Sequence, residues 1–488
     1  MMSKPKRLHP AAMIFHIIQT LKQSILGFLP VAIAFISNGG LFYLMIAIPI
    51  VVVLIILFSF LSWLRFTYRL EEDQLRIERG IFIRKKRTIS KHRIQSIDLS
   101  QNIIHRIFGL TKLEIETAGN DSSTDAGLSA VTMADGQMLH NELKYKKHVS
   151  EAASEESSEE VKTEPEEKNE ANLPQRKITV KALLITGSTS ASFGILIGIF
   201  GFAFSQVETF IPDRFYDETA RWVLSLGLQI IIILCLIVLL YLWLLSILYS
   251  VIKDWNFTIT RYEKELFITR GLLEKKQTTI PLKRIQAVGI KESPLHQLFG
   301  FIRVYVEIAS GDTKNNQEMN TIIFPLLRKK EFGAFLATFL PEYHYSVGNL
   351  IRLPRKALPY YLFRSIDLLL LAVIVVGIFF SPYIWIPVIL MIITGIYGWA
   401  AFKSAGYAID EQQITVQTRR FSKDTVFIPQ RRIQALQRKQ HILHRKQSLA
   451  TIDMAILNKA SGRHFVIKEL RVTDSNQIAD WYSSRKES

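Results

Sequence analysis

Six long apolar runs, arranged as three pairs, constrain the fold of this chain more than any other feature of its sequence. The runs cover residues 24–37 and 41–63, 182–204 and 222–250, and 361–380 and 383–402. A helix needs about 20 apolar residues to cross the ~30 Å hydrocarbon layer of a bilayer. Soluble proteins rarely bury helices this long and this apolar in series, so we expect six transmembrane helices in three pairs.

The segment before the first run has a different pattern. Ile14, Ile17, Ile18 and Leu21 recur at helical spacing, with polar residues such as Lys22 on the opposite face. This pattern is typical of an amphipathic helix at the membrane interface. We therefore expect an interfacial helix that leads into the first span, and no cleaved signal peptide.

Basic residues lie mainly outside the pairs of apolar runs. The formal net charge is +17, and Lys and Arg gather in the flanking segments KPKR, RFTYR, QRKITVK and RLPRK. The positive-inside rule then places both termini and all long polar regions in the cytoplasm. The single cysteine, Cys235, excludes an intramolecular disulfide, and no Cys/His spacing of a zinc site is present. We expect neither a metal nor a cofactor.

One segment is strongly acidic. Residues 151–170 carry nine Glu and two Lys, and their only β-branched residues are Val161 and Thr163. Such a segment cannot bury enough apolar surface to fold. We interpret residues 151–175 as a disordered linker.

The polar regions after the pairs contain one motif three times. Arg-Ile-Gln begins at Arg93, Arg284 and Arg432, and in each copy a His follows twelve residues after the Arg. The residues before the motif alternate between apolar and polar with a period of two, which predicts strands joined by short turns. Gly80 and Gly271 stand thirteen residues before the Arg, where a hairpin turn with positive φ favours glycine. Another strand follows each His, and helical segments end the second and third copies.

The third copy departs from this pattern. It has Arg419 in place of the turn glycine, and Gln447 and Ser448 in place of the Phe-Gly that ends the His-x-x-Phe-Gly motif in the other two copies. We interpret the third copy as diverged.

The turn glycine, the Ile-Pro-x-x-Arg-Ile-Gln segment and the His-x-x-Phe-Gly motif resemble those of the bacterial pleckstrin-homology-like (PH-like) domain of the YdbS/YdbT family of membrane proteins. The resemblance covers nearly the whole chain. It implies a small barrel-like sheet with a C-terminal helix, held at the cytoplasmic membrane of a bacterium. The expected fold is an α+β membrane protein in which a cytoplasmic PH-like module follows each transmembrane pair. The expected divisions are an interfacial helix and pair 1 (1–64), module 1 (65–150), the acidic linker (151–175), pair 2 (176–252), module 2 (253–345), pair 3 (346–404) and a diverged module 3 (405–488).

The hairpin before each Arg-Ile-Gln motif is basic. Each Lys or Arg near an anionic leaflet contributes ~1 kcal/mol to membrane binding, so these residues are candidate contacts to anionic lipid. They are Arg84, Lys85, Lys86, Arg87, Arg93, Lys275, Lys276, Lys283, Arg284, Arg419, Arg420, Arg431 and Arg432. The alternative is structural: the motif Arg bonds a carboxylate or a backbone carbonyl on a neighbouring strand, and the remaining charge is ordinary positive-inside charge.

Two classes of function lack support in the sequence. No Ser, Cys or Asp recurs at matched positions beside the repeated His, as a catalytic site would need. No basic face carries aromatic residues for stacking on nucleic acid. We therefore expect a non-enzymatic membrane protein whose modules bind anionic lipid or a membrane protein partner, in envelope maintenance or stress protection.

Other partners and functions remain as alternatives. The modules could self-associate or pair with a smaller sister membrane protein of the same family, because exposed sheet edges favour such contacts. A lipid or peptide transporter with regulatory modules would need polar residues at mid-membrane depth. A lipid-modifying enzyme would need a pocket with perturbed titratable groups.

Overall fold

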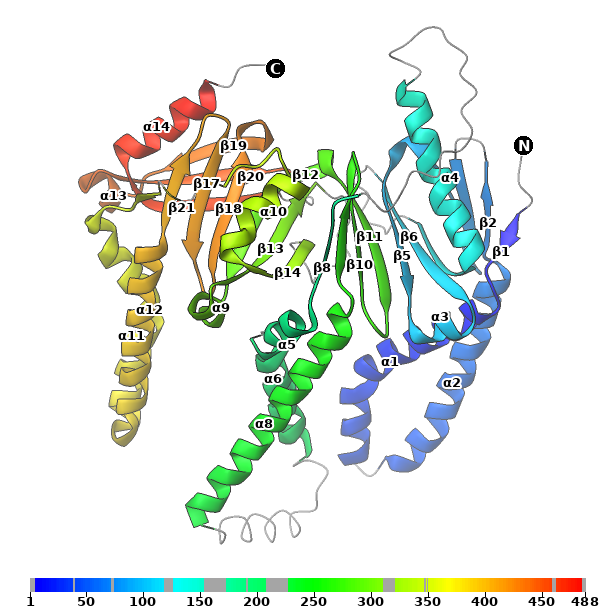
Figure 1. Ribbon diagram of the computed structural model, residues 1–488. Coiled ribbons are helices and arrows are strands. Elements are labelled where there is room, and N and C mark those ends of the chain that lie inside the picture. The colour runs from blue at the N-terminus through cyan, green and yellow to red at the C-terminus, as the bar shows by residue number, and fades with distance from the viewer. Residues whose placement is uncertain are drawn as a thin grey trace.

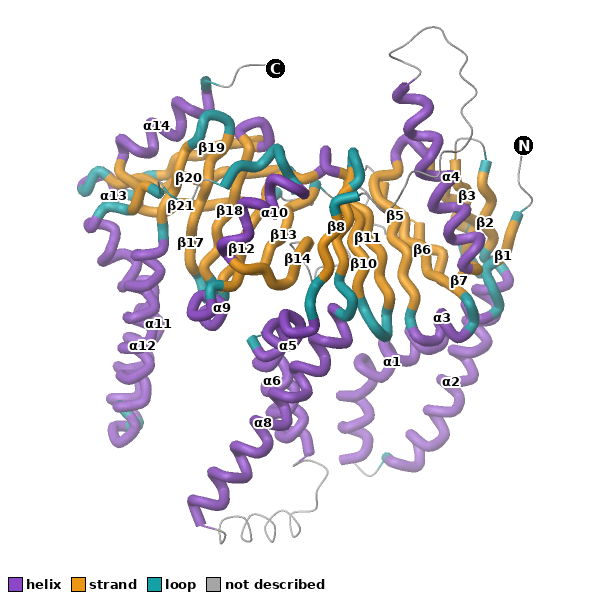
Figure 2. The backbone as a smooth tube through the Cα atoms, viewed as in Figure 1, coloured by secondary structure: helices purple, strands orange, loops and turns teal. Residues whose placement is uncertain are grey.

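The computed structural model describes residues 5–37, 40–71, 74–117, 126–152, 173–189, 192–207, 227–309, 321–345, 348, 350–458 and 462–484. Three similar units follow one another along the chain, each with apolar helices, two groups of antiparallel strands and a closing helix. The long apolar helices of all three units leave the strands on the same side (Figure 1). Figure 2 shows the strand-rich parts of the three units side by side in a row.

The first unit contains the helices α1 (Ala11–Ser37), α2 (Leu41–Leu64), α3 (Ile103–Ile107) and α4 (Met133–Ala152), and the strands β1 (Lys6–Arg7), β2 (Thr67–Leu70), β3 (Gln74–Arg79), β4 (Lys85–Ser90), β5 (Ile94–Gln101), β6 (Leu110–Thr117) and β7 (Ala126–Thr132). Most of the predicted acidic linker, residues 153–172, lies outside the described residues.

The second unit contains the helices α5 (Val180–Ser188), α6 (Ser192–Val207), α8 (Gly227–Asp254), α9 (Pro294–Phe299) and α10 (Phe332–Phe339), and the strands β8 (Gln175–Lys177), β9 (Thr258–Arg261), β10 (Glu265–Arg270), β11 (Lys275–Pro281), β12 (Ile285–Glu292), β13 (Phe301–Ile308) and β14 (Thr321–Arg328). The third unit contains the helices α11 (Leu358–Phe379), α12 (Trp385–Ser404), α13 (Ile442–Lys446) and α14 (Val472–Ser483), and the strands β15 (Ile351–Arg352), β16 (Gly406–Ile409), β17 (Gln413–Arg419), β18 (Lys423–Pro429), β19 (Ile433–Lys439), β20 (Leu449–Ile456) and β21 (Arg463–Arg471).

Several helices are long and apolar enough to cross a membrane. Among the described residues these are Phe42–Leu64, Ile232–Asp254, Arg355–Phe379 and Ser381–Ser404, and the bent pair Val180–Ser188 and Phe193–Phe202 adds a fifth if it is one span. The first predicted run, 24–37, falls within α1, which is not among these helices. Part of the second pair, residues 208–226, lies outside the described residues. The structure therefore supports several apolar spans, and the number six stays a prediction.

Each module has a hydrophobic core between its strands and its last helix, and Phe427 of β18 in module 3 also packs in the core of module 2. In module 2, Leu266 and Ile268 point into the core from alternate positions of β10, as the period of two predicted. Phe335 and Phe339 of α10 cover the strands and contact each other with ring centroids 4.8 Å apart. Modules 1 and 3 build equivalent cores beneath α4 and α14.

Neighbouring modules are joined edge to edge, so two seven-stranded sheets each cross a module boundary. β5 of module 1 pairs with β11 of module 2, and β12 of module 2 pairs with β18 of module 3. Both junctions have the same register, because Gln101 faces Lys275 at the first and Glu292 faces Lys423 at the second. Gln101 and Glu292 each lie eight positions after the Arg of their Arg-Ile-Gln motif, and Lys275 and Lys423 each lie nine positions before the Arg of theirs. The repeat thus extends from the module to the contact between modules.

Candidate membrane-facing site

The β10–β11 hairpin ends against the module end of helix α8. The backbone N–H groups of Gly271 and Leu272 donate to the carbonyl oxygens of Trp255 and Ile252, both at 2.9 Å. These bonds satisfy carbonyls that the end of a helix leaves without an intrahelical partner. Gly271 has φ 103° and Gly80 of module 1 has φ 118°, so the prediction that both turns need glycine is confirmed. The turn therefore fixes the tip of the hairpin at the end of a candidate span.

The predicted basic residues of modules 1 and 2 fall into two groups at opposite ends of the modules. One group lies beside the hairpin tips, and the other follows the strand that leads away from the tip. Since β11 has seven residues, its ends lie roughly 20 Å apart at about 3.3 Å per residue. The tip group is Arg84, Lys85, Lys86, Arg87, Lys275 and Lys276, and the far group is Arg93, Lys283 and Arg284.

The tip group is largely solvent-exposed. Arg84 and Lys85 are exposed, and an Nη2 atom of Arg84 donates to Glu78 of β3 at 2.7 Å. Lys275 is exposed and Lys276 is half-buried. Their ammonium groups are placed where an anionic surface at the end of the spans would meet them.

In the far group, the side chain of Arg284 has a structural contact, whereas that of Lys283 is exposed. Both Nε and Nη2 of Arg284 donate to the carbonyl oxygen of Ala309, just after β13, with the Nε bond at 3.0 Å. Arg284 therefore holds the end of a neighbouring strand, as the structural interpretation of the Arg-Ile-Gln motif expected. The Arg ends a short 3₁₀ turn, and the following Ile285 begins β12 and is buried.

In module 3 most of the predicted basic residues contact module 2. Arg432 donates to the carbonyl oxygen of Lys283 at 2.8 Å, and Arg431 pairs with Glu342. Arg419 donates to the side chain of Gln297 in α9. Arg420 is exposed beside the β17–β18 turn. These contacts hold the junction, and lipid binding by this group stays a prediction.

The repeated His joins each module to the first apolar helix of its own unit. In module 2, Nε2 of His296 lies 2.7 Å from Oγ1 of Thr189, the residue after α5. The ring of His105 in module 1 stacks on Phe15 of α1 with centroids 3.8 Å apart, and its Nε2 lies 2.8 Å from the carbonyl oxygen of Ser129. Burial lowers the pKa of His296 to about 4, so this ring is neutral at physiological pH. The His is a docking residue for the short helix that carries it.

The third His makes the same kind of contact. His444 in α13 lies edge-on to Tyr360 of α11, with ring centroids 5.0 Å apart. In all three modules, therefore, the short helix after the Arg-Ile-Gln strand is packed against the first helix of its own unit. The twelve-residue spacing reflects a strand, a turn and this docking contact.

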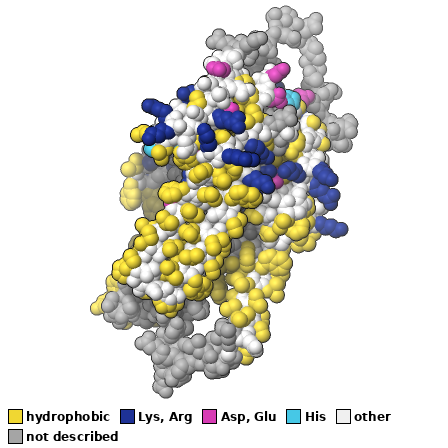
Figure 3. Space-filling view, turned by 90° about the vertical axis from the view of Figure 1, so that its left-hand side faces the viewer, with side chains coloured by type: hydrophobic (Ala, Val, Ile, Leu, Met, Phe, Trp, Pro, Cys, Tyr) yellow, Lys and Arg dark blue, Asp and Glu magenta, His cyan; other side chains and the backbone are white. Residues whose placement is uncertain are grey.

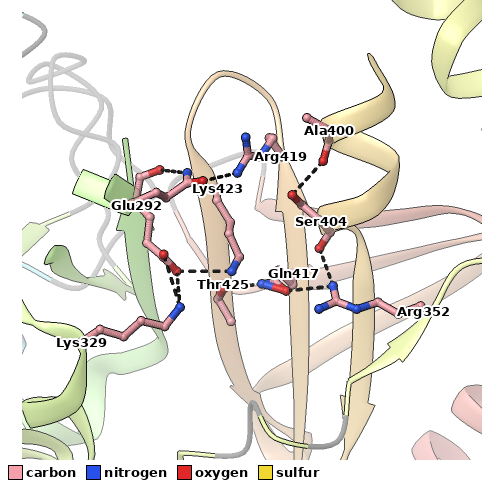
Figure 4. Close-up of polar contacts among 10 residues, drawn as sticks. Glu292, Lys329, Arg352, Ala400, Ser404, Gln417, Arg419, Lys423 and Thr425 are labelled. Carbon is pink, nitrogen blue, oxygen red and sulfur yellow. Dashed lines mark hydrogen bonds and ion pairs between the residues drawn. The ribbon is translucent and has the colours of Figure 1, made fainter. Parts of the chain in front are cut away.

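A buried ion-pair cluster lies at the junction between modules 2 and 3. The carboxylate of Glu292, at the end of β12, lies 3.3 Å from Nζ of Lys329 and 3.5 Å from Nζ of Lys423 (Figure 4). The Glu292 side chain is 6% exposed, and burial lowers the pKa of Lys423. At the first junction the neutral Gln101 occupies the position of Glu292. This cluster was not predicted from the sequence. The available signal was the charged Glu292 at a position where the other two copies carry glutamine, Gln101 and Gln440.

A second chain of polar side chains leads from this junction to the candidate span α12. Nη1 of Arg352 donates to the carbonyl oxygen of Ser404 at the end of α12 (3.0 Å) and to the side chain of Gln417 (3.2 Å). The amide of Gln417 donates to Oγ1 of Thr425 on β18, at 3.4 Å (Figure 4). The span end, the first sheet of module 3 and the strand that contacts module 2 are thus connected by hydrogen bonds.

The basic side chains also gather on the surface. Figure 3 shows a belt of Lys and Arg across one face of the molecule, between the apolar surface of the long helices and the strand-rich part. A belt at this level is the arrangement expected where a protein meets lipid head groups.

Comparison with known proteins agrees with this repeated architecture. The Bacterial PH domain family matches the chain three times, at residues 24–147, 204–342 and 358–486. The chain is also 35% identical over 492 residues to the UPF0699 transmembrane protein YdbT of Bacillus subtilis (strain 168), an alignment that covers 100% of this chain and 99% of that protein. The chain therefore belongs to the UPF0699 family of transmembrane proteins and carries three bacterial PH domains.

Proposed function

We propose that this chain is a non-enzymatic, multi-pass protein of the bacterial cytoplasmic membrane whose PH-like modules bind anionic lipid head groups through the tips of their basic hairpins. Six spans in three pairs would hold the modules at the cytoplasmic face, with both termini on that side. The function would be envelope maintenance or stress protection.

The position of the β10–β11 hairpin is the observation that carries this proposal. Its backbone is bonded to the last carbonyls of α8, a candidate span, so its tip lies at the membrane surface wherever that span ends. Lys275 and Lys276 follow the tip directly. Two lysines near an anionic leaflet would contribute roughly 2 kcal/mol, and the hairpins of the other modules place further basic residues at the same level.

Native mass spectrometry of the full chain in a neutral detergent tests this proposal. We expect more bound phosphatidylglycerol than phosphatidylcholine at equal lipid concentration, and a smaller excess in the double variant Lys275→Gln, Lys276→Gln. The matched control is Lys264→Gln, Lys283→Gln, which removes the same charge from exposed side chains at the far end of the same strands. An equal number of the two lipids on the wild-type chain would refute the proposal. So would equal losses in the double variant and the control.

A further inference from the structure

Large apolar side chains are exposed at two repeated places in the modules. The first place is the hairpin tip before each Arg-Ile-Gln strand, and the second is the short helix after it. Exposed at the tips are Phe82, Ile83, Leu272, Leu273 and Phe421, and exposed on or beside the short helices are Ile103, Ile107, Phe108, Leu295, Leu298, Phe299, Ile442 and Leu443. The exposed fraction reaches 90% at Phe82, 79% at Leu298 and 74% at Phe421, so these residues do not belong to the cores.

Apolar residues are unusual in tight turns, where Gly, Asn, Asp, Ser and Pro dominate. The sequences of the three tips are GIFIRKK, GLLEKK and RRFSK. All three combine large apolar residues with Lys or Arg, although the residues themselves differ. The third copy has lost the turn glycine but still presents Phe421. In the first two copies a Lys or Arg follows within two residues of the last apolar side chain, and in the third the exposed Arg420 precedes Phe421. Exposed apolar residues next to cations are typical of segments that lie in a membrane interface.

The short helix α9 lies alongside the helices of its unit rather than beyond their ends. His296 of α9 bonds Thr189, and the carbonyl oxygen of the adjacent Ser188 accepts from Nε1 of Trp243 in α8, at 3.4 Å. Trp243 lies eleven residues before Asp254, where this candidate span ends. Eleven residues are about three helical turns. The short helix α9 therefore lies beside the helices of its unit, within about three helical turns of the end of α8.

At each junction the two apolar features come together. Nη1 of Arg106, in α3 of module 1, donates to the carbonyl oxygen of Leu272 at the tip of module 2, at 2.9 Å. Arg419, at the tip of module 3, donates to Gln297 in α9 of module 2. The same register of strand pairing produces both contacts. Each junction thus builds one apolar surface from two modules.

We propose that these tips and short helices are wedges that insert into the lipid interface, with a two-module wedge at each junction. The apolar side chains enter the acyl region next to the head groups, while the adjoining Lys and Arg contact the phosphates. Joining the modules edge to edge then has a function, since it assembles a wedge that no module has alone. This inference deepens the proposed function and rests on it, because both require the tips at the bilayer surface.

Depth-dependent quenching in nanodiscs tests the wedges with the full chain. In a Cys235→Ser background, single cysteines at Leu273, Leu298 or Phe421 carry an environment-sensitive fluorophore, and the quenchers are lipids brominated either near the head group or near the chain end. These sites are exposed, so the substitutions should not disturb folding. The native Cys235, exposed on the candidate span α8, is the lipid-facing standard, and a cysteine at Lys264 is the aqueous standard.

We expect all three labels to be quenched more by bromine near the head group than by bromine near the chain end, in phosphatidylcholine as well as in phosphatidylglycerol. Labels that behave like the one at Lys264 in both lipids would overturn the wedges, even if the chain still binds more phosphatidylglycerol. That result would also follow if a protein partner, absent from the nanodisc, covered the tips. Quenching without any preference for phosphatidylglycerol would instead support the wedges and remove the anionic-lipid part of the proposed function.

Discussion

Removing the carboxylate of Glu292 should weaken the junction between modules 2 and 3. The Glu292→Gln substitution leaves the ammonium groups of Lys329 and Lys423 facing a neutral amide. Lys329 is 36% exposed and can turn to water, whereas Lys423 is 18% exposed. Breaking a buried ion pair by removing one partner costs about 3–5 kcal/mol. Because only one of the two lysines is trapped, we expect the lower end, about 3 kcal/mol.

Amide hydrogen exchange measures this loss locally, without treating a large membrane protein as a two-state system. A loss of 3 kcal/mol corresponds to a roughly 100-fold fall in protection, and we expect it in β12 and β18. The β5–β11 junction, where Gln101 already occupies this position, should keep its protection. Replacing Lys423 by Met as well should restore most of the loss, because the double variant has no trapped charge. A fall of less than about threefold at β12 and β18, or an equal fall at both junctions, would refute the reasoning.

Three further outcomes follow from single positions. Ser448 has φ 57° where module 2 has a glycine, so Ser448→Gly should stabilise module 3 locally by about 1 kcal/mol, seen as higher amide-exchange protection in that module. Unchanged protection would show that the strain is absent. Burial raises the pKa of Glu307 from 4.5 to about 7, so the native chain holds this proton at pH values where the unfolded chain has lost it. The stability of the wild-type chain therefore falls as pH rises from about 4.5 to 7. The unfolding temperature of Glu307→Gln should decrease less over that range, and parallel pH profiles of the two chains would contradict this. The edge strands β4 and β19 are unpaired on one side among the described strands. If β19 of one molecule paired with β4 of another in the register of the module junctions, Lys439 would face Lys85, and these like charges disfavour the pairing. Lys85→Glu should therefore promote concentration-dependent association, measured by light scattering, and an unchanged molecular mass would argue against this register.

Much of the architecture could be predicted from the sequence because its signals are local. The alternation of apolar residues gave the strands, and glycine at positions 80 and 271 gave the turns. Pairing of modules through exposed sheet edges was among the expectations, but the particular edges, β5 with β11, could not be predicted because they depend on residues far apart in the chain. The basic residues were predicted as one lipid-binding group. The predicted strand between Lys276 and Lys283 is long enough to place these two residues at opposite ends of a module, so their division into two groups could have been predicted.

Anionic lipid head groups should contact the hairpin tips of the membrane-bound chain. The most direct measurement is phosphorus-31 relaxation in a bilayer with equal amounts of phosphatidylglycerol and phosphatidylcholine, with a nitroxide attached at position 273 of the full chain. We predict that the nitroxide broadens the phosphatidylglycerol resonance more than the phosphatidylcholine resonance. A nitroxide at position 264 should broaden neither. Equal broadening of both resonances by the label at position 273 would contradict the account.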